Sequence, residues 1–161
     1  MATVYIETSI VSHASALPSN DIEIAALQQQ ARQWWHKQRQ AYQLVKSQFV
    51  LDEVSLGDPS AAARRLEMLV NVPILLSDGR VEVVAEAILS HSLMPQKAKL
   101  DALHVAMAAV SGVQYLLTQN CKHIANARIL PRVYKLLEEM GLPSILICTP
   151  VEFLGYHGDE I

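Results

Sequence analysis

Short apolar runs alternate along the chain with longer segments of helical periodicity. Runs rich in β-branched or aromatic residues predict strands at 3–6, 48–51, 72–75, 113–118 and 144–149. Between them, apolar residues recur at the three- and four-residue spacing of amphipathic helices. Strands that alternate with helices in this way predict a parallel α/β sheet with helices on its faces.

Capping residues and helix breakers punctuate the helical segments. The first predicted helix begins at a capping box of Asn20 and Glu23, and its apolar stripe reaches Val45. A second helix is predicted to start at Asp58 and Pro59. Two further helices are predicted over 79–92 and from about 97 to 111. Gly112 and Gly141 stand where a helix should end and a strand begin. No repeat or linker divides the chain, so residues 1–161 are predicted to form a single domain.

Composition and charge narrow the class of protein. The chain has 161 residues, of which 51% are hydrophobic and 18% charged, so we expect a compact domain. A formal net charge of −3 argues against a broad basic surface that grips nucleic acid non-specifically. Two cysteines without CxxC spacing indicate neither a disulfide scaffold nor a zinc site. Without a signal peptide or a long apolar stretch, the expected location is the cytoplasm, with no membrane contact.

Acidic and amide side chains stand where the predicted strands end. Glu7 follows the first strand, Glu53 follows the second and Asn120 follows the strand at 113–118. Asp101 opens the helix that leads into that same strand, and the rest of that helix is apolar nearly all round. Because ligands of open parallel sheets bind at the carboxyl ends of the strands, these side chains are predicted to converge there.

Clustered carboxylates repel one another unless a cation shares the site. Mg²⁺ prefers oxygen ligands, and a divalent ion of this kind supports hydrolysis of phosphodiesters. Each acid could alternatively be a helix cap or a first-turn residue, and only their joint placement favours a metal site. Thr8 and Ser9 could cap the turn after the first strand or support the site. For His123 a structural role is the alternative to a contact with phosphate, and for His104 a core role is favoured.

Four stretches together resemble a known family. The segments YIETSI, VLDEVSLGDPSAAARRL, KLDALHVAMA and YLLTQNCKHIANA, in this order, look like a PIN domain and most resemble its VapC-like branch of bacterial toxins. The resemblance implies a small PIN-like α/β/α sandwich around a mostly parallel sheet of four to five strands. It also implies an endoribonuclease that depends on Mg²⁺ or Mn²⁺, acts on RNA, forms a homodimer and pairs with a cognate antitoxin in a toxin–antitoxin system.

The same resemblance assigns site residues. Carried over to this chain, the acidic site consists of Glu7, Glu53, Asp101 and Asn120, with Glu7, Glu53 and Asp101 as the metal ligands and Ser9 and His123 in support. Glu7 stands where the family usually has Asp, and Asn120 stands where an acid is frequent. The longer Glu7 side chain could shift the metal, and the Asn120 amide brings no negative charge.

These observations leave three hypotheses. The leading one is a metal-dependent endoribonuclease that hydrolyses RNA phosphodiester bonds. The alternative is a catalytically weakened PIN-like module that binds RNA or a partner protein without cleaving, which Asn120 motivates. A third is a structural dimerisation domain that uses Trp35, taken as the more exposed of the two tryptophans.

Overall fold

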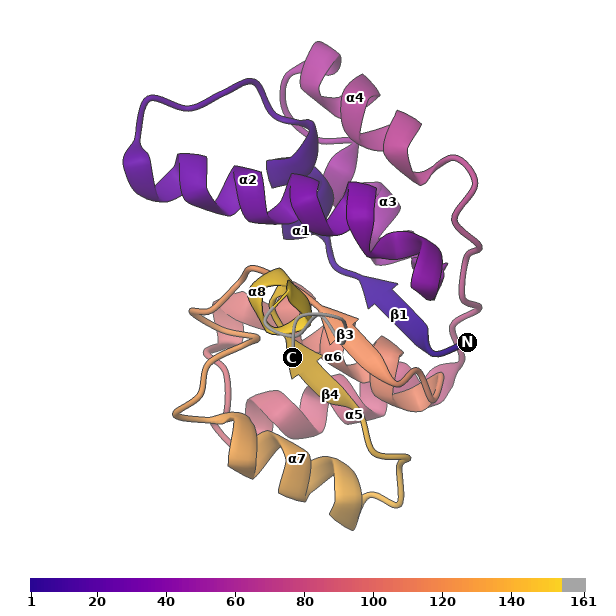
Figure 1. Cartoon of the computed structure of the whole chain (residues 1–161). Helices are drawn as coiled ribbons and strands as arrows, with labels where there is room; N and C mark the ends of the chain where they lie inside the picture. Colours follow the sequence, from indigo (N-terminus) through magenta and orange to yellow (C-terminus); the bar gives the residue numbers. More distant parts are fainter. Residues whose placement is uncertain (155–161) are drawn as a thin grey trace, which may run out of the picture.

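A four-stranded parallel sheet organises the protein (Figure 1). The computed structural model describes residues 1–154. The strands lie in the order β2 (Gln43–Val45), β1 (Thr3–Ile6), β3 (Tyr115–Leu117) and β4 (Leu146–Cys148). Val4 at the centre pairs with Leu44 on one side and Tyr115 on the other. Because every pair is parallel, the carboxyl ends of all four strands meet at one edge.

Helices cover both faces of this sheet. One layer, at the top of Figure 1, consists of α1 (Thr8–Ser15), α2 (Ile22–Lys37), α3 (Gln48–Val54) and α4 (Pro59–Leu69). The other layer consists of α5 (Gly79–Ser90), α6 (Lys99–Val110) and α7 (Leu130–Glu139), and a last short helix, α8 (Pro150–Leu154), lies against α2. The predicted α/β/α sandwich with a parallel sheet of four to five strands is therefore confirmed.

Helix α6 is the most deeply buried helix segment of the described chain. Residues 102–109 are all buried, as the apolar sequence on every side of this helix predicts. Asp101 in its first turn keeps 19% of its side chain exposed, so the acid reaches the edge of the sheet while the rest of the helix stays inside. The helix ends at Val110, and Gly112, which follows the C-cap Ser111, has a φ of +69°, a left-handed conformation that favours glycine.

Several predicted boundaries are confirmed. Asp58 caps α4, accepting a hydrogen bond from the Ala61 backbone N–H at 2.9 Å, and Pro59 occupies the first turn. Helix α5 begins at Gly79 as predicted and ends two residues early at Ser90. The strands predicted at 113–118 and 144–149 are present in shorter form as β3 and β4.

The prediction of a strand over 48–51 is wrong. These residues open helix α3, because the Ser47 side chain caps the helix by accepting from the Val50 N–H. The second strand instead precedes it, as β2, in a segment predicted to be helical up to Val45. The Gln43 N–H donates to the Ala2 carbonyl at 2.9 Å, and such pairing with a distant strand outweighs the local helical period.

Two smaller predictions are also wrong. Residues 72–75 contribute only a single bridge, between Lys46 and Ile74. The N-cap of α2 is Asp21 rather than Asn20, and its carboxylate accepts from two backbone N–H groups.

Trp35 is the more exposed of the two tryptophans, as predicted, at 5% against 0% for Trp34. The Arg39 guanidinium lies over its ring, so Trp35 offers little area to an interface.

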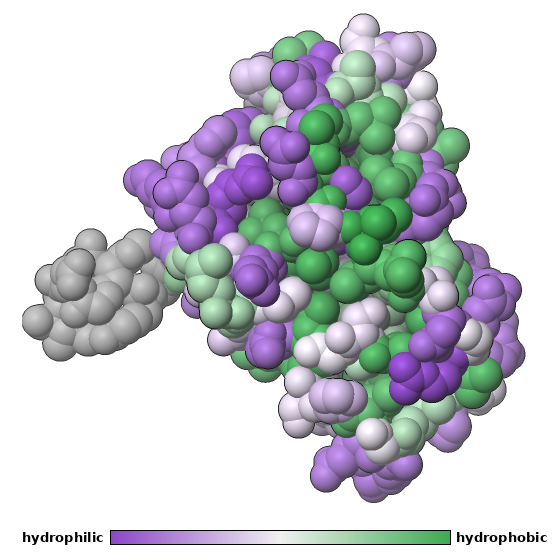
Figure 2. All heavy atoms as spheres, turned by 90° about the vertical axis from the view of Figure 1, so that its right-hand side faces the viewer, coloured by the Kyte–Doolittle hydropathy of each residue, from purple (hydrophilic) through white to green (hydrophobic). Residues whose placement is uncertain are grey.

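One side of the protein is markedly apolar. Figure 2 shows the side that lies to the right in Figure 1, with hydrophobic side chains gathered across its middle. The connection from α4 to α5 crosses this side and exposes Val70, Ile74 and Leu76. None of the helices within residues 1–154 is long and apolar enough to span a membrane.

Candidate metal centre

Glu7 lies where β1 leaves the sheet. Its backbone N–H donates to the Leu117 carbonyl at 3.1 Å, which continues the pairing of β1 with β3 by one residue. Its side chain then caps α1, with Oε2 accepting from the Ser9 N–H at 3.0 Å. Glu7 itself is therefore the cap that Thr8 or Ser9 was expected to supply. The carboxylate is only 4% exposed, so its charge must be satisfied by neighbouring groups.

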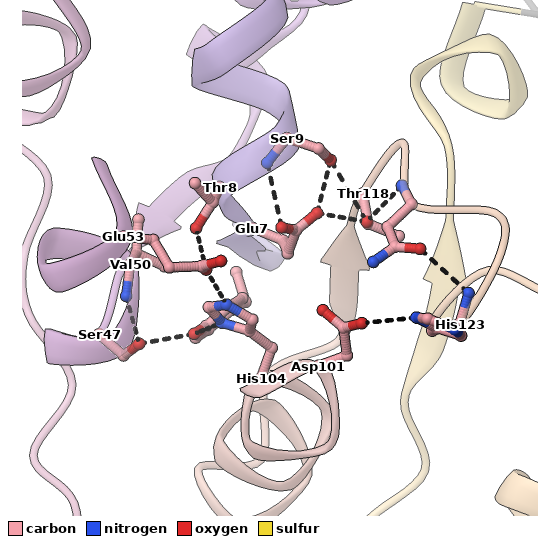
Figure 3. Close-up of polar contacts among 12 residues, drawn as sticks. Glu7, Thr8, Ser9, Ser47, Val50, Glu53, Asp101, His104, Thr118 and His123 are labelled. Carbon is pink, nitrogen blue, oxygen red and sulfur yellow. Dashed lines mark hydrogen bonds and ion pairs between the residues drawn. The ribbon is translucent and has the colours of Figure 1, made fainter. Parts of the chain in front are cut away.

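Two hydroxyl groups satisfy the other oxygen of Glu7 (Figure 3). Oε1 accepts from Ser9 Oγ at 2.5 Å and from Thr118 Oγ1. Each hydroxyl accepts in turn from a backbone N–H after β3: Ser9 Oγ from Gln119 and Thr118 Oγ1 from Asn120. The loop after β3 thus holds the Glu7 side chain in place through two hydroxyl bridges.

Glu53 reaches the same edge from helix α3 rather than from the end of a strand. Its Oε1 accepts from Thr8 Oγ1 at 2.6 Å and from His104 Nε2 at 2.5 Å. Burial by itself raises the pKa of the Glu53 carboxyl, but the hydrogen bonds from His104 and Thr8 lower it further than burial raises it. The net shift of this pKa is downward, so Glu53 is ionised at neutral pH.

Asp101 is held by His123, the histidine predicted to support the site. Its Oδ2 lies 3.0 Å from His123 Nδ1, and both side chains are 19% exposed. Asn120 accepts from the His123 backbone N–H through Oδ1 at 3.0 Å. Asn120 therefore shapes the loop that carries His123, while Asp101 and His123 lie side by side (Figure 3).

The tightest group of potential metal ligands is Glu7, Glu53 and His104. Ligand atoms of these three residues all lie within 4.8 Å of one another. Asp101 is outside this group and lies beside it, between His104 and His123 (Figure 3). The structure thus brings Glu7 and Glu53 together as predicted, places Asp101 at the margin, and adds His104.

The chemistry of this group fits a divalent cation. Two carboxylates and a nearby third concentrate negative charge, and no lysine or arginine within residues 1–154 forms an ion pair with them. Carboxylate oxygens suit both Mg²⁺ and Mn²⁺. A cation is the group that would balance this charge.

Some contributors to the site were missed or misjudged from sequence. His104 was expected to have a core role; it is indeed fully buried, yet it contacts Glu53 directly. Its position three residues after Asp101 on one helix face was the available signal. Thr118 carried no sequence signal, because its contact with Glu7 spans 111 positions.

A parallel four-stranded sheet between two helical layers, with acids at the carboxyl edge, is a VapC-like fold, as the sequence resemblance implied. One solved structure that this chain resembles is Mycobacterium tuberculosis VapC20, described as a Sarcin-Ricin loop cleaving toxin. The TM-score is 0.57 at 16% sequence identity, over 74% of this chain and 92% of that one. No protein-family model and no curated protein matches the chain.

Proposed function

We propose that the protein is a metal-dependent endoribonuclease of the VapC toxin kind, which hydrolyses RNA phosphodiester bonds. The observation that carries this proposal is the placement of Glu7 and Glu53, with Asp101 beside them, at the carboxyl edge of a VapC-like sheet, where no lysine or arginine within residues 1–154 forms an ion pair with them. The fold shared with VapC20, which is described as a Sarcin-Ricin loop cleaving toxin, supports the same reaction class.

The residues take distinct roles in this proposal. Glu7, Glu53 and Asp101 hold Mg²⁺ or Mn²⁺, Ser9 orients Glu7, and Asn120 positions the loop that carries His123. When bound, a divalent cation supplies Lewis-acid activation of water and neutralises charge that develops on phosphate. His123 is oriented by Asp101 through Nδ1, and no other described residue hydrogen-bonds its Nε2, which can contact a phosphate oxygen.

The proposed partners follow from the same function. RNA is the substrate, and a cognate antitoxin is the expected regulator. The net charge of −3 favours RNA binding at the metal site over binding across the whole surface. The apolar face in Figure 2 supports a protein partner, because exposed apolar patches mark interaction surfaces. Homodimerisation and a cytoplasmic location stay predictions.

The decisive experiment measures cleavage of a mixed single-stranded RNA pool with Mg²⁺, Mn²⁺ or EDTA. We expect metal-dependent cleavage that Asp101→Asn and Glu53→Gln each reduce by more than the roughly 10- to 100-fold typical of losing an outer metal-site partner. Asp52→Asn is the matched control, because Asp52 adjoins Glu53 on α3 but bonds to Gln48. Equal cleavage by all four proteins would contradict the proposal.

One observation favours the non-cleaving alternative. Both oxygens of Glu7 already accept protein hydrogen bonds, three in all, and the side chain is nearly buried. Such a carboxylate could be structural, leaving a module that binds RNA or a protein. Mn²⁺ titration separates the two functions: a non-cleaving module without a metal site would bind Mn²⁺ equally well before and after Asp101→Asn.

A further inference from the structure

A buried series of hydrogen bonds runs behind Glu53 and returns to the start of its own helix. Ser47 Oγ, which caps α3, lies 2.6 Å from the Tyr5 hydroxyl. The Tyr5 hydroxyl lies 2.7 Å from His104 Nδ1, and His104 Nε2 lies 2.5 Å from Glu53 Oε1. Tyr5 and His104 are fully buried and Ser47 is 1% exposed, so water does not interrupt the series (Figure 3).

The donor and acceptor in each hydrogen bond follow from the groups at the two ends of the series, Glu53 and Ser47. An ionised carboxylate only accepts, so the proton between Glu53 and His104 is on Nε2. With Nε2 protonated in a neutral imidazole, Nδ1 accepts the Tyr5 proton. The Tyr5 oxygen then accepts the Ser47 proton, and Ser47 Oγ accepts the Val50 N–H at 3.4 Å.

The reverse direction leaves a proton without an acceptor. If His104 Nδ1 also carried a proton, Tyr5 would have to donate to Ser47. The Ser47 hydroxyl would then have no acceptor among the described residues, since its only other contact is the Val50 N–H donor. A buried donor left unpaired is costly.

We propose that this one-way relay, from Ser47 through Tyr5 and His104 to Glu53, makes His104 a positioning residue that holds Glu53 for the cation. The relay and the Thr8 hydroxyl both bind Oε1, which leaves Oε2 of Glu53 for a ligand. Because Nε2 is occupied by its proton, His104 is not itself a metal ligand. The consequence for the metal rests on the proposed function, whereas the direction of the relay does not.

The relay also couples the two central acids. Tyr5 and Glu7 are two residues apart at the end of β1, so their side chains leave the backbone on the same side. Glu53 is therefore linked, through His104 and Tyr5, to the same end of β1 that positions Glu7. The aligned dipoles of Ser47, Tyr5 and His104 all point their positive ends toward Glu53, and hydrogen bonds in such a series strengthen one another.

The first test reads the His104 tautomer in the full-length protein, by long-range proton–nitrogen NMR of the imidazole nitrogens. We expect a neutral ring protonated at Nε2, unchanged on addition of Mg²⁺. A ring protonated at Nδ1 or at both nitrogens would overturn the relay. Loss of the Nε2 proton on addition of Mg²⁺ would make His104 a ligand and would equally overturn the proposal. This readout requires neither cleavage nor tight metal binding.

The second test compares Tyr5→Phe with Tyr134→Phe. The Tyr134 hydroxyl accepts from the Ile147 N–H in β4, outside the metal centre, so this variant is a matched control. We expect Tyr5→Phe to deprive His104 Nδ1 of its donor, which shifts the Nδ1 resonance while Glu53 keeps the proton on Nε2. We also expect it to weaken Mn²⁺ binding about 10-fold, the low end for the partner of a metal ligand, while Tyr134→Phe changes neither. A folded Tyr5→Phe that keeps both the Nδ1 resonance and the Mn²⁺ affinity would refute the relay.

A third variant pair tests rescue. His104→Gln retains an amide donor toward Glu53, whereas His104→Leu fills the space without one, so Mn²⁺ should bind more tightly to His104→Gln. Equal affinities in two folded variants would argue against a positioning role. If the wild-type protein neither binds Mn²⁺ nor cuts RNA, the proposed function fails; the relay is then judged by the wild-type tautomer and by the shift of the Nδ1 resonance in Tyr5→Phe.

Discussion

At the scale of single residues, hydroxyl groups determine how the acids are held. Ser9 and Thr118 donate to Glu7, and Thr8 donates to Glu53. A short hydroxyl side chain loses little conformational freedom when it is fixed, and its bond to a charged group is among the stronger hydrogen bonds. At Glu53, burial by itself would raise the pKa of the carboxyl, and the hydrogen bonds from His104 and Thr8 outweigh this effect.

Replacement of the Thr8 hydroxyl should give a pH-dependent loss of stability. The folded pKa of Glu53 is lowered, so its contribution is present above the unfolded value of about 4.3 and is lost as pH falls through the folded pKa. Thr8→Val removes one of the hydrogen bonds responsible. We expect a loss of about 1–2 kcal/mol in the free energy of unfolding at pH 7, decreasing as pH falls below about 4.

Urea unfolding in EDTA across this pH range provides the measurement. Thr149→Val is the matched control, because it removes a threonine–glutamate hydrogen bond, to Glu152, at an exposed position. The control variant should lower the free energy of unfolding by less, and this loss should not vary with the ionisation of Glu53. A Thr8→Val cost that is constant with pH would show that the hydroxyl does not act on the Glu53 charge.

At the scale of elements, α3 positions Glu53 and is itself fixed at both ends. Ser47 caps its beginning. At its end Arg65 of α4 donates to the carbonyls of Val54, at 3.0 Å, and Leu56, at 2.6 Å. A helix of seven residues is too short to be stable alone, so these tertiary contacts hold it in place.

Arg65→Met should therefore loosen α3. We expect the free energy of unfolding to fall by about 1–3 kcal/mol, since two hydrogen bonds from a charged donor are lost, and Mn²⁺ affinity to fall with it. Arg80→Met is the control, because Arg80 pairs with its near neighbour Asp78 in an exposed position. Denaturant unfolding and Mn²⁺ titration of both variants provide the measurement; equal behaviour would contradict the role given to Arg65.

At the scale of the whole molecule, the two helical layers determine where the acids lie, and the exposed apolar face favours association with another protein. The layers bury the sheet and leave its carboxyl edge for the acids (Figure 1). The α4–α5 connection exposes Ile74 and Leu76, the latter at 90%. Exposed apolar area of this kind favours association with another protein surface, in line with the predicted homodimer.

Leu76→Asp should shift the predicted dimer to monomer, because it introduces charge into an apolar contact. Leu17→Asp is the matched control, since Leu17 is 70% exposed and lies outside the α4–α5 connection. Sedimentation velocity over a range of concentrations measures the effect. A wild-type protein that is monomeric throughout would contradict the predicted dimer, and equal effects of both variants would place the contact elsewhere.

The sequence by itself determined the α/β class, the buried helix that begins near Asp101, and the candidate acids. These features depend on local patterns: apolar periodicity, the Asp58–Pro59 helix start, and the left-handed backbone at Gly112. The resemblance of four sequence stretches to a known family also predicted the VapC-like fold, although the identity to VapC20 over the aligned residues is only 16%.

Only the tertiary structure decided that residues 48–51 form a helix and residues 43–45 a strand, because strand pairing with β1 overrode the local helical pattern. It also decided the partners of each acid. Glu7 meets Thr118 and Glu53 meets His104, contacts of 111 and 51 positions in sequence separation. Hydrogen bonds depend on distances of a few tenths of an ångström between such remote groups, and no periodicity along the chain encodes those distances.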